Sequence, residues 1–260
     1  MKRPAALPAD LPYRGVIGLA KTGFRALGQR LRIEGSEHVP ATGPVLIASN
    51  HISYVDFVYA GLAAQPRLVR FMAKQEIFAH PVGGPVMRSM RHIPVDRAQG
   101  DGSVRSALRY LAAGEAVGIF PEATISRAFD LKEFKSGTVR IAAAAGVPVL
   151  PVIVWGTQRM MTKDRPRDFS RGLAISMVVG EPLHPDGSDP DAEAGELKSR
   201  MTALLDHAIA TYADGTPEGA WWLPARFGGG APDLDEAVRL DAEERARRLA
   251  KRREERARKR

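Results

Sequence analysis

A histidine and an aspartate five residues apart are the first side chains in this sequence that could do chemistry together. His51 follows the apolar run 45–48, which predicts a short buried strand, and Asp56 lies where a helical pattern begins near Ser53. The carboxyl ends of strands are where open α/β sheets place their active clefts. There a neutral imidazole can take the proton of a substrate hydroxyl, while a carboxylate fixes its tautomer and stabilises the imidazolium. The pair predicts a base with its orienting acid, and the substrate hydroxyl is then the nucleophile.

Two simpler interpretations of this spacing stay open at this point. Ser53 and Asp56 have the spacing of a capping box, in which the carboxylate would only satisfy amides at the start of a helix. The spacing also recurs by chance, because His184 and Asp189 repeat it within the turn-rich stretch 185–190. That stretch predicts no helix to hold the second aspartate, so we expect no catalytic role there.

The elements that must position His51 alternate between strands and helices along the chain. Strands are predicted at 45–48, 67–73, 92–95, 116–120, 147–155 and 173–179, and helices near 53–62, 74–78, 85–90, 103–113, 136–145 and 192–212. This alternation predicts an α/β fold with a mixed, mostly parallel sheet flanked by helices.

Composition limits the class of protein and its partners. The chain has 260 residues, of which 44% are hydrophobic and 26% charged, as in a globular protein. It has no cysteine, which excludes thiolate nucleophiles, disulfides and cysteine-based zinc sites and fits a cytosolic protein. The net charge of +8 predicts an anionic partner such as a membrane surface, a phosphorylated substrate or nucleic acid. Residues 1–14 lack the apolar region of a signal peptide, and glycine and proline interrupt the longest uncharged run, 141–158, so we expect no spanning helix.

The two ends of the chain carry distinct charge patterns. Residues 1–34 are predicted to contain an amphipathic, membrane-associating helix at 11–31, whose apolar positions are Val16, Ala20, Phe24, Leu27 and Leu31. The alternative is that this stripe packs on the domain. Residues 35–230 are the expected catalytic domain, and 231–260 a charged, basic, helical tail. The last twenty residues hold ten Arg or Lys and five acids without an apolar stripe, which favours a solvated helix over binding to anionic lipid or RNA.

Further polar candidates follow the ends of other predicted strands. Arg97 comes after the strand at 92–95, and a guanidinium matches phosphate geometry in a bidentate way. Glu122 follows the strand at 116–120, so it would face the same edge as His51 if the two strands are parallel. Shortly beyond it lie Ser126, Arg127 and Lys135.

Taken in order, four segments resemble the motifs of the lysophospholipid acyltransferase family, the 1-acyl-sn-glycerol-3-phosphate acyltransferases and their relatives. The segments are Asn-His-Ile-Ser-Tyr-Val-Asp at 50–56, Arg-His-Ile-Pro-Val-Asp-Arg at 91–97, Phe-Pro-Glu-Ala-Thr-Ile-Ser at 120–126 and Gly-Val-Pro-Val-Leu-Pro-Val at 146–152. Lys135-Ser-Gly137 occupies the Lys-x-Gly position between the last two. The resemblance spans roughly residues 30–180, and four segments in the right order are far more specific than any one of them.

The resemblance implies a glycerolphosphate acyltransferase-like fold and an O-acyltransferase acting in phospholipid biosynthesis. The donor would be an acyl thioester, either acyl-CoA or acyl carrier protein, and the acceptor a lysophospholipid such as 1-acyl-sn-glycerol-3-phosphate. His51 would be the base and Asp56 its partner, with backbone amides after Asn50 facing the developing oxyanion. The implied substrate-binding residues are Arg97, Glu122, Thr124, Ser126, Arg127 and Lys135. No metal or cofactor is implied, no nucleic-acid partner is expected, and the enzyme would sit peripherally on the cytoplasmic face of the cell membrane.

Two departures from the third motif bear on the acceptor. Ala123 stands where glycine is usual, and Ile125 where arginine is usual, which removes one phosphate contact. Either Arg127 replaces that contact, or the acceptor is a glycolipid or another lysolipid. Two alternatives of other classes also stay open: a non-catalytic protein that binds anionic membranes through its basic ends, and a metal-dependent hydrolase, for which further ligands at suitable spacing are lacking.

Overall fold

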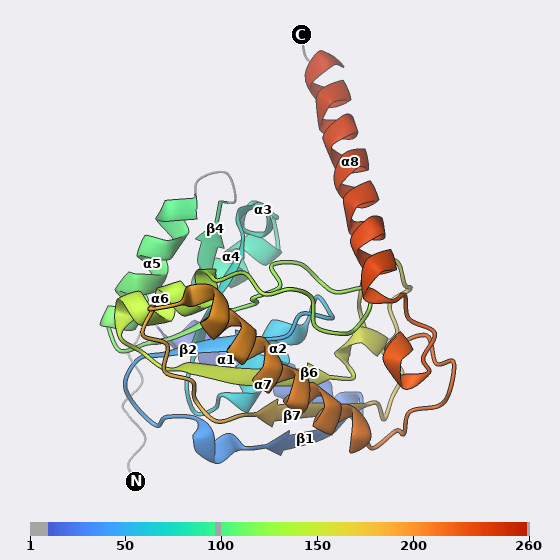
Figure 1. Cartoon of the computed structure of the whole chain (residues 1–260), viewed down its shortest axis with the longest axis horizontal. Coiled ribbons are helices and arrows are strands. Elements are labelled where there is room, and N and C mark those ends of the chain that lie inside the picture. The colour runs from blue at the N-terminus through green and yellow to red at the C-terminus, as the bar shows by residue number, and fades with distance from the viewer. Residues whose placement is uncertain (1–9, 97–99, 259–260) are drawn as a thin grey trace.

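One mixed β-sheet forms the centre of the protein in the computed structural model, which describes residues 10–96 and 100–258 (Figure 1). Its strands are β1 (Arg30–Glu34), β2 (Val45–Ser49), β3 (Val69–Lys74), β4 (Ile93–Val95), β5 (Ala116–Ile119), β6 (Val149–Trp155) and β7 (Ala174–Val179). The spatial order is β1-β7-β6-β2-β5-β3-β4. Within this sheet β6 and β7 pair antiparallel and the other neighbours pair parallel. The predicted mixed, mostly parallel sheet is confirmed.

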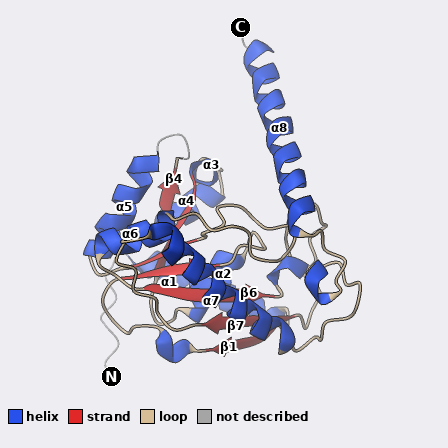
Figure 2. Ribbon diagram, viewed as in Figure 1, coloured by secondary structure: helices blue, strands red, loops and turns tan. Residues whose placement is uncertain are grey.

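Helices cover both faces of the sheet, as Figure 2 shows. They are α1 (Leu11–Ala26), α2 (Asp56–Ala63), α3 (Gln75–Phe78), α4 (Gly83–Ser89), α5 (Gly100–Ala112), α6 (Gly137–Ala145), α7 (Pro190–Ala210) and α8 (Leu234–Arg258). Short 3-10 turns lie at Ser36–His38, Thr157–Arg159 and Ala225–Phe227. Alternate residues of β2 enter opposite cores: Leu46 and Ala48 pack with α5, α6 and α7, whereas Val45 and Ile47 pack with α2. Because both faces are covered, the central strands β2 and β6 are buried along their whole length.

The N-terminal helix is shorter than predicted, and a strand follows it. Helix α1 ends at Ala26, and Gly28 then takes a φ of +59°, a left-handed conformation that glycine adopts without a steric penalty. The chain next forms β1, which lies beside β7 at the edge of the sheet. The prediction of a helix to residue 31 is therefore wrong in its last turn. β1 carries Arg30, Arg32 and Glu34, so local pattern alone did not mark it as a strand.

The inner face of α1 packs on the domain. The Tyr13 hydroxyl donates a hydrogen bond to the Val69 carbonyl oxygen at 2.8 Å, and the Phe24 ring stacks on Tyr59 at 4.8 Å between centroids. These contacts agree with the alternative in which the apolar stripe faces the core. The outward-facing apolar side chains of α1 are Leu11 and Leu19, which are 62% and 75% exposed. In the described parts of the chain, no helix combines the length and the apolar character needed to cross a membrane.

Helix α8 extends away from the body of the molecule, with the C-terminus at its far end (Figure 1). The predicted helical character of the charged tail is confirmed over this range. Among the side chains of α8 that are described, only Ala237 is a buried apolar one. The attachment of this helix to the domain therefore has little hydrophobic component, and its ion pairs are described below.

Candidate active site

His51 and Asp56 meet at the carboxyl end of β2. The Nδ1 atom of His51 lies 3.0 Å from Oδ2 of Asp56, whose carboxyl group is fully buried, while the imidazole remains 21% exposed. Asp56 Oδ2 also accepts the N–H groups of Ile52 and Ser53, both at 2.7 Å, and Oδ1 accepts the Thr157 hydroxyl at 2.6 Å. An ionised carboxylate can only accept, so Nδ1 carries the proton and Nε2 is left as the basic nitrogen. The two side chains are therefore in contact, as the spacing predicted, while their roles as base and orienting acid stay a prediction.

The capping alternative is also partly realised. Asp56 accepts the Ser53 N–H, which is one half of a capping box, but the Ser53 hydroxyl donates to the Met161 carbonyl oxygen at 2.6 Å. One carboxylate therefore orders the β2–α2 turn (50–55) and holds the imidazole at the same time. Helix α2 begins at Asp56 rather than near Ser53.

Asn50 fixes the end of β2 that carries His51. Its fully buried amide pairs with the backbone of Val154 on β6, accepting the N–H at 2.8 Å and donating to the carbonyl oxygen at 2.9 Å. The His51 ring then stacks on Phe120 at 4.1 Å between centroids. Both contacts restrict the imidazole. No local pattern predicts this role of Asn50, because its partner Val154 is 104 residues away in the chain.

Glu122 reaches the same sheet edge as His51, as expected if β2 and β5 run parallel, which they do. Its Oε1 atom accepts the His51 backbone N–H at 2.9 Å, and Oε2 accepts the Lys132 backbone N–H at 3.2 Å. Burial raises the pKa of Glu122 to about 8, although the two N–H groups and the Lys132 charge act in the opposite direction. The carboxyl group thus lies behind the base and bonds to its backbone.

The amides that follow Asn50 are already hydrogen bonded. His51 donates to Glu122, Ile52 and Ser53 donate to Asp56, and Tyr54 donates to the Met161 carbonyl oxygen at 3.0 Å. The expectation that these amides face an oxyanion is therefore not met in this structure. Their physical role here is to fix Asp56 and the shape of the β2–α2 turn.

The rest of the third motif contacts both His51 and a lysine that the sequence did not single out. Ser126 donates its backbone N–H to the His51 carbonyl oxygen at 2.7 Å, and its buried hydroxyl has no partner among the described residues. The Thr124 hydroxyl accepts a hydrogen bond from Lys132 Nζ. Ala123 has a φ of +60°, the left-handed region that the usual glycine would occupy freely, and Ile125 is only 4% exposed.

Two of the predicted phosphate-binding cations, Arg127 and Lys135, lie among the described residues. Arg127 is 6% exposed and pairs with three carboxylates: Asp164 through Nε at 2.6 Å, Glu244 through Nη2 at 3.0 Å, and Asp241 through Nη1. Lys135 is exposed at the start of α6. Arg97 lies outside the described residues, so its predicted contact stays a prediction.

Two other features limit alternative sites. Asp189, in the second histidine–aspartate pair, accepts the Ala192 N–H at 3.0 Å and caps α7, although the sequence predicted no helix to hold it. Within the ranges 10–96 and 100–258, no group of three or more His, Asp or Glu side chains has an arrangement that could hold a metal ion.

Comparison with known proteins matches this region. A family model described as Acyltransferase matches residues 30–155. The 1-acyl-sn-glycerol-3-phosphate acyltransferase of Bacillus subtilis is 30% identical over 180 residues, which cover 69% of this chain and 86% of that protein. The chloroplastic 1-acyl-sn-glycerol-3-phosphate acyltransferase LPAT1 of Arabidopsis thaliana is 30% identical over 181 residues, 68% of this chain but 49% of the relative, so the chain spans about half of that protein's length.

A solved structure resembles most of this chain. The crystal structure of the 1-acyl-sn-glycerophosphate acyltransferase PlsC from Thermotoga maritima superimposes with a TM-score of 0.66 at 25% identity, covering 77% of this chain and 80% of that one. The span matched by the family model contains the His51–Asp56 pair together with Glu122 and Ser126. Sequence similarity, fold and the geometry at the end of β2 agree, and the chain belongs to the family of the 1-acyl-sn-glycerol-3-phosphate acyltransferases.

Proposed function

We propose that this protein transfers an acyl chain from an acyl thioester, acyl-CoA or acyl carrier protein, to the hydroxyl of a lysophospholipid, and that 1-acyl-sn-glycerol-3-phosphate is the acceptor. The observation that carries the proposal is the bond of His51 Nδ1 to the buried Asp56 carboxylate, which leaves Nε2 as a base on a partly exposed ring. The names of the Bacillus and Arabidopsis relatives support the acceptor and the place in phospholipid synthesis.

The reaction needs one base that later acts as an acid. His51 Nε2 takes the proton of the acceptor hydroxyl as that oxygen attacks the thioester carbonyl carbon. Asp56 stabilises the imidazolium that results, since its carboxylate faces the Nδ1–H. The tetrahedral intermediate then expels the thiolate, which receives the proton from the imidazolium. The products are the acyl ester of the acceptor and the free thiol, and no metal takes part in these steps.

The remaining residues of the motifs are assigned to the acceptor and to the loop that holds it. Arg97 would bind the phosphate, with Lys135 in support, and Arg127 would join them only by exchanging a carboxylate partner for the phosphate. Glu122, Thr124 and Ser126 would order the loop beside His51. The exposed Leu11 and Leu19 on α1 support peripheral contact with an anionic membrane, for which we propose the cytoplasmic face.

The test offers the purified protein a mixture of acyl thioesters and a mixture of lysolipids and identifies the products by mass spectrometry. Wild-type protein is expected to form phosphatidate, and His51→Ala to lose at least about 10³-fold in rate while keeping its unfolding midpoint. Near-normal turnover by folded His51→Ala would exclude the base role. Arg97→Ala should mainly raise the acceptor KM, and an unchanged KM would exclude its phosphate contact.

A second acceptor class is favoured by one observation. Ile125, at the position of the usual arginine, is buried and apolar, so it offers no donor to a phosphate. A glycolipid or another lysolipid acceptor would suit this change. If the mixed assay acylates such lipids and leaves lysophosphatidate unreacted, the acceptor proposed above is wrong. The proposed acyl-transfer mechanism would still hold. The non-catalytic membrane binder predicts no product at all.

A further inference from the structure

Three cations from two separate loops converge on two acids in the first half of α8. Lys132 Nζ lies 3.0 Å from Asp241 Oδ2, and Lys163 Nζ lies 2.8 Å from Asp241 Oδ1 and 3.3 Å from Glu244 Oε2. Arg127 pairs with both acids, reaching Glu244 at 3.0 Å. We call these five residues the α8 clamp. Arg127 and Lys132 belong to the β5–α6 loop (120–136), whereas Lys163 belongs to the segment after β6 (156–164).

The same two loops hold the turn that carries the base. From the β5–α6 loop, Glu122 accepts the His51 N–H and Ser126 donates to the His51 carbonyl oxygen at 2.7 Å. From the segment after β6, the hydroxyls of Thr157 and Thr162 donate to Asp56 Oδ1 and to the Ile52 carbonyl oxygen, at 2.6 and 2.7 Å. Both loops thus form hydrogen bonds with the β2–α2 turn, so the geometry of this turn depends on the relative position of the two loops.

Lys132 connects the clamp to the base most directly. Its ammonium group contacts Asp241 and the Thr124 hydroxyl, while its backbone N–H is the donor to Glu122 Oε2. Asp241 is therefore linked to the N–H of His51 through the side chain and the backbone of Lys132 and through the Glu122 carboxyl group. A shift of Lys132 would therefore move Glu122 and, with it, the backbone of His51.

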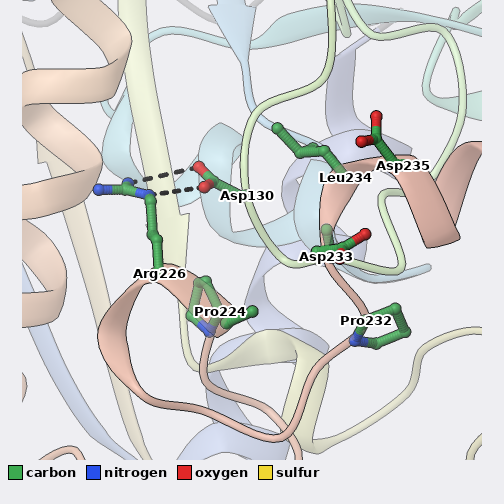
Figure 3. A pocket seen from close by; sticks show the side chains of 9 residues that line it. Asp130, Pro224, Arg226, Pro232, Asp233, Leu234 and Asp235 are labelled. Carbon is green, nitrogen blue, oxygen red and sulfur yellow. Dashed lines mark hydrogen bonds and ion pairs between the residues drawn. The ribbon is translucent and has the colours of Figure 1, made fainter.

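Ionic contacts, rather than apolar packing, attach α8 to these loops. A pocket of about 410 Å³ separates Ala128 and Asp130 of the β5–α6 loop from Pro232–Asp235, where α8 begins. Figure 3 shows Arg226 reaching across to Asp130 beside this hollow, a bidentate pair with a closest distance of 2.6 Å. The Arg127, Lys132 and Lys163 side chains are only 6%, 11% and 12% exposed. Removing both acids of α8 would leave Arg127 with Asp164 alone, Lys132 with the Thr124 hydroxyl, and Lys163 without either of its carboxylate partners, so largely desolvated charges would lose most of their compensation.

From this geometry we propose that Asp241 and Glu244 are positioning residues for acyl transfer: through the α8 clamp they tie together the two loops that hold His51 and Asp56. The acids lie beyond the span 30–155 that the family model matches, so this is a property of the chain's C-terminal helix. The expected effect on rate rests on the proposed function, but the expected effect on loop order does not.

The test compares Asp241→Asn/Glu244→Gln with the matched control Glu243→Gln in the full-length protein. Glu243 is a neighbouring acid of the same helix that pairs with Arg239 at 3.0 Å, four residues earlier on α8. The double variant is expected to lower kcat at least about tenfold with the acceptor KM within about twofold, because alignment rather than binding is lost. Glu243→Gln should stay within about twofold of wild type, and Asp241→Glu, which keeps the charge, should retain most of the turnover.

A pair of truncations separates the clamp from the basic tail. Ending the chain after Glu244 removes the cations of 245–260 but keeps the clamp, and this variant should retain wild-type kcat. Ending it after Leu240 removes both and should behave like the double variant. If both truncations lose the same fraction of kcat, and only when the substrate is presented in a membrane, the helix serves membrane binding. That result would overturn the proposed role of the α8 clamp.

Hydrogen–deuterium exchange of the substrate-free protein supplies a readout that does not need the enzyme to work as proposed. In the double variant, amides of 120–136 and 156–164 should exchange at least about tenfold faster, with the strands β2 and β6 unchanged. Wild-type exchange in both loops would overturn the proposal whatever the acceptor is. So would a lower acceptor KM with kcat maintained, since Asp241 would then be a competitor of the acceptor for these cations.

Discussion

The backbone N–H of His51 donates to Oε1 of Glu122 at 2.9 Å, so the acid of one motif bonds to the main chain of the histidine in another. Glu122 is buried, and its second oxygen accepts the N–H of Lys132. Because both oxygens already accept N–H groups, this carboxyl group holds the β5–α6 loop against the β2–α2 turn. Its ionisation is therefore coupled to the stability of the site.

The pH dependence of stability should reveal Glu122. This carboxyl ionises near pH 4.5 in the unfolded chain, whereas burial raises its pKa to about 8 in the folded protein. Its contribution is fully present below pH 4.5 and is lost as the pH rises through 8, because the folded protein holds a proton that the unfolded chain has released. The slope from one proton is at most about 1.4 kcal/mol per pH unit.

Glu122→Gln removes this titration but leaves one backbone N–H facing an amide NH₂, a pH-independent cost of about 1–3 kcal/mol. The stability of wild type relative to the variant should therefore fall as the pH rises from 5 through 8, and level off by pH 9. Urea unfolding of both proteins across this range measures it. Two parallel pH curves would show that Glu122 does not titrate in this window.

The charge of Asp56 is expected to matter more than its shape. In Asp56→Asn the amide oxygen can keep the N–H groups of Ile52 and Ser53, and the NH₂ can donate to Thr157, so the imidazole stays in place. What is lost is the negative charge beside the imidazolium, which should lower kcat about 10²–10³-fold. Steady-state kinetics with an unfolding midpoint as control measures this, and a folded variant with near-normal kcat would remove Asp56 from the mechanism.

Asn50 should prove important for both stability and turnover. Asn50→Ala leaves the buried N–H and carbonyl oxygen of Val154 without partners, which should cost about 2–4 kcal/mol in the free energy of unfolding. Because His51 is the next residue, kcat should also fall at temperatures where the variant is fully folded. Chemical denaturation and kinetics on the same preparation test both, and a loss below about 0.5 kcal/mol would contradict the structural role.

Ala123→Gly should stabilise the protein. A non-glycine residue in the left-handed region costs about 1–2 kcal/mol, which the substitution would remove. Glycine also has more conformational freedom in the unfolded chain, which offsets part of this gain in stability. The expected net gain of about 0.5–1 kcal/mol corresponds to a rise of about 2 °C in Tm. Scanning calorimetry is the measurement. A lower Tm would mean that Ala123 contributes packing that outweighs its backbone strain.

Much of the fold and half of the site followed from local pattern. The alternation of apolar runs with helical periodicity marked β2 through β7 to within a few residues, since burial on both faces requires continuous apolar strands. The relation of His51 to Glu122 could also be predicted, because the ends of parallel strands share one edge of a sheet. The four ordered segments by themselves resemble the motifs of the acyltransferase family.

Contacts between distant parts of the chain could not be predicted in this way. The strand conformation of β1 depends on its pairing with β7 at the edge of the sheet. The pairing of Asn50 with Val154 joins residues that are too far apart in the chain to leave a periodic signal. In the sequence, Lys132 and the acids of α8 have no feature that separates them from ordinary surface charges, and only the fold brings them together. Sequence by itself determined which side chains sit at the strand end, since that depends on local periodicity. The tertiary structure alone decided which charges hold that end in place, because ion pairs form wherever folding brings opposite charges within reach, whatever their spacing in the chain.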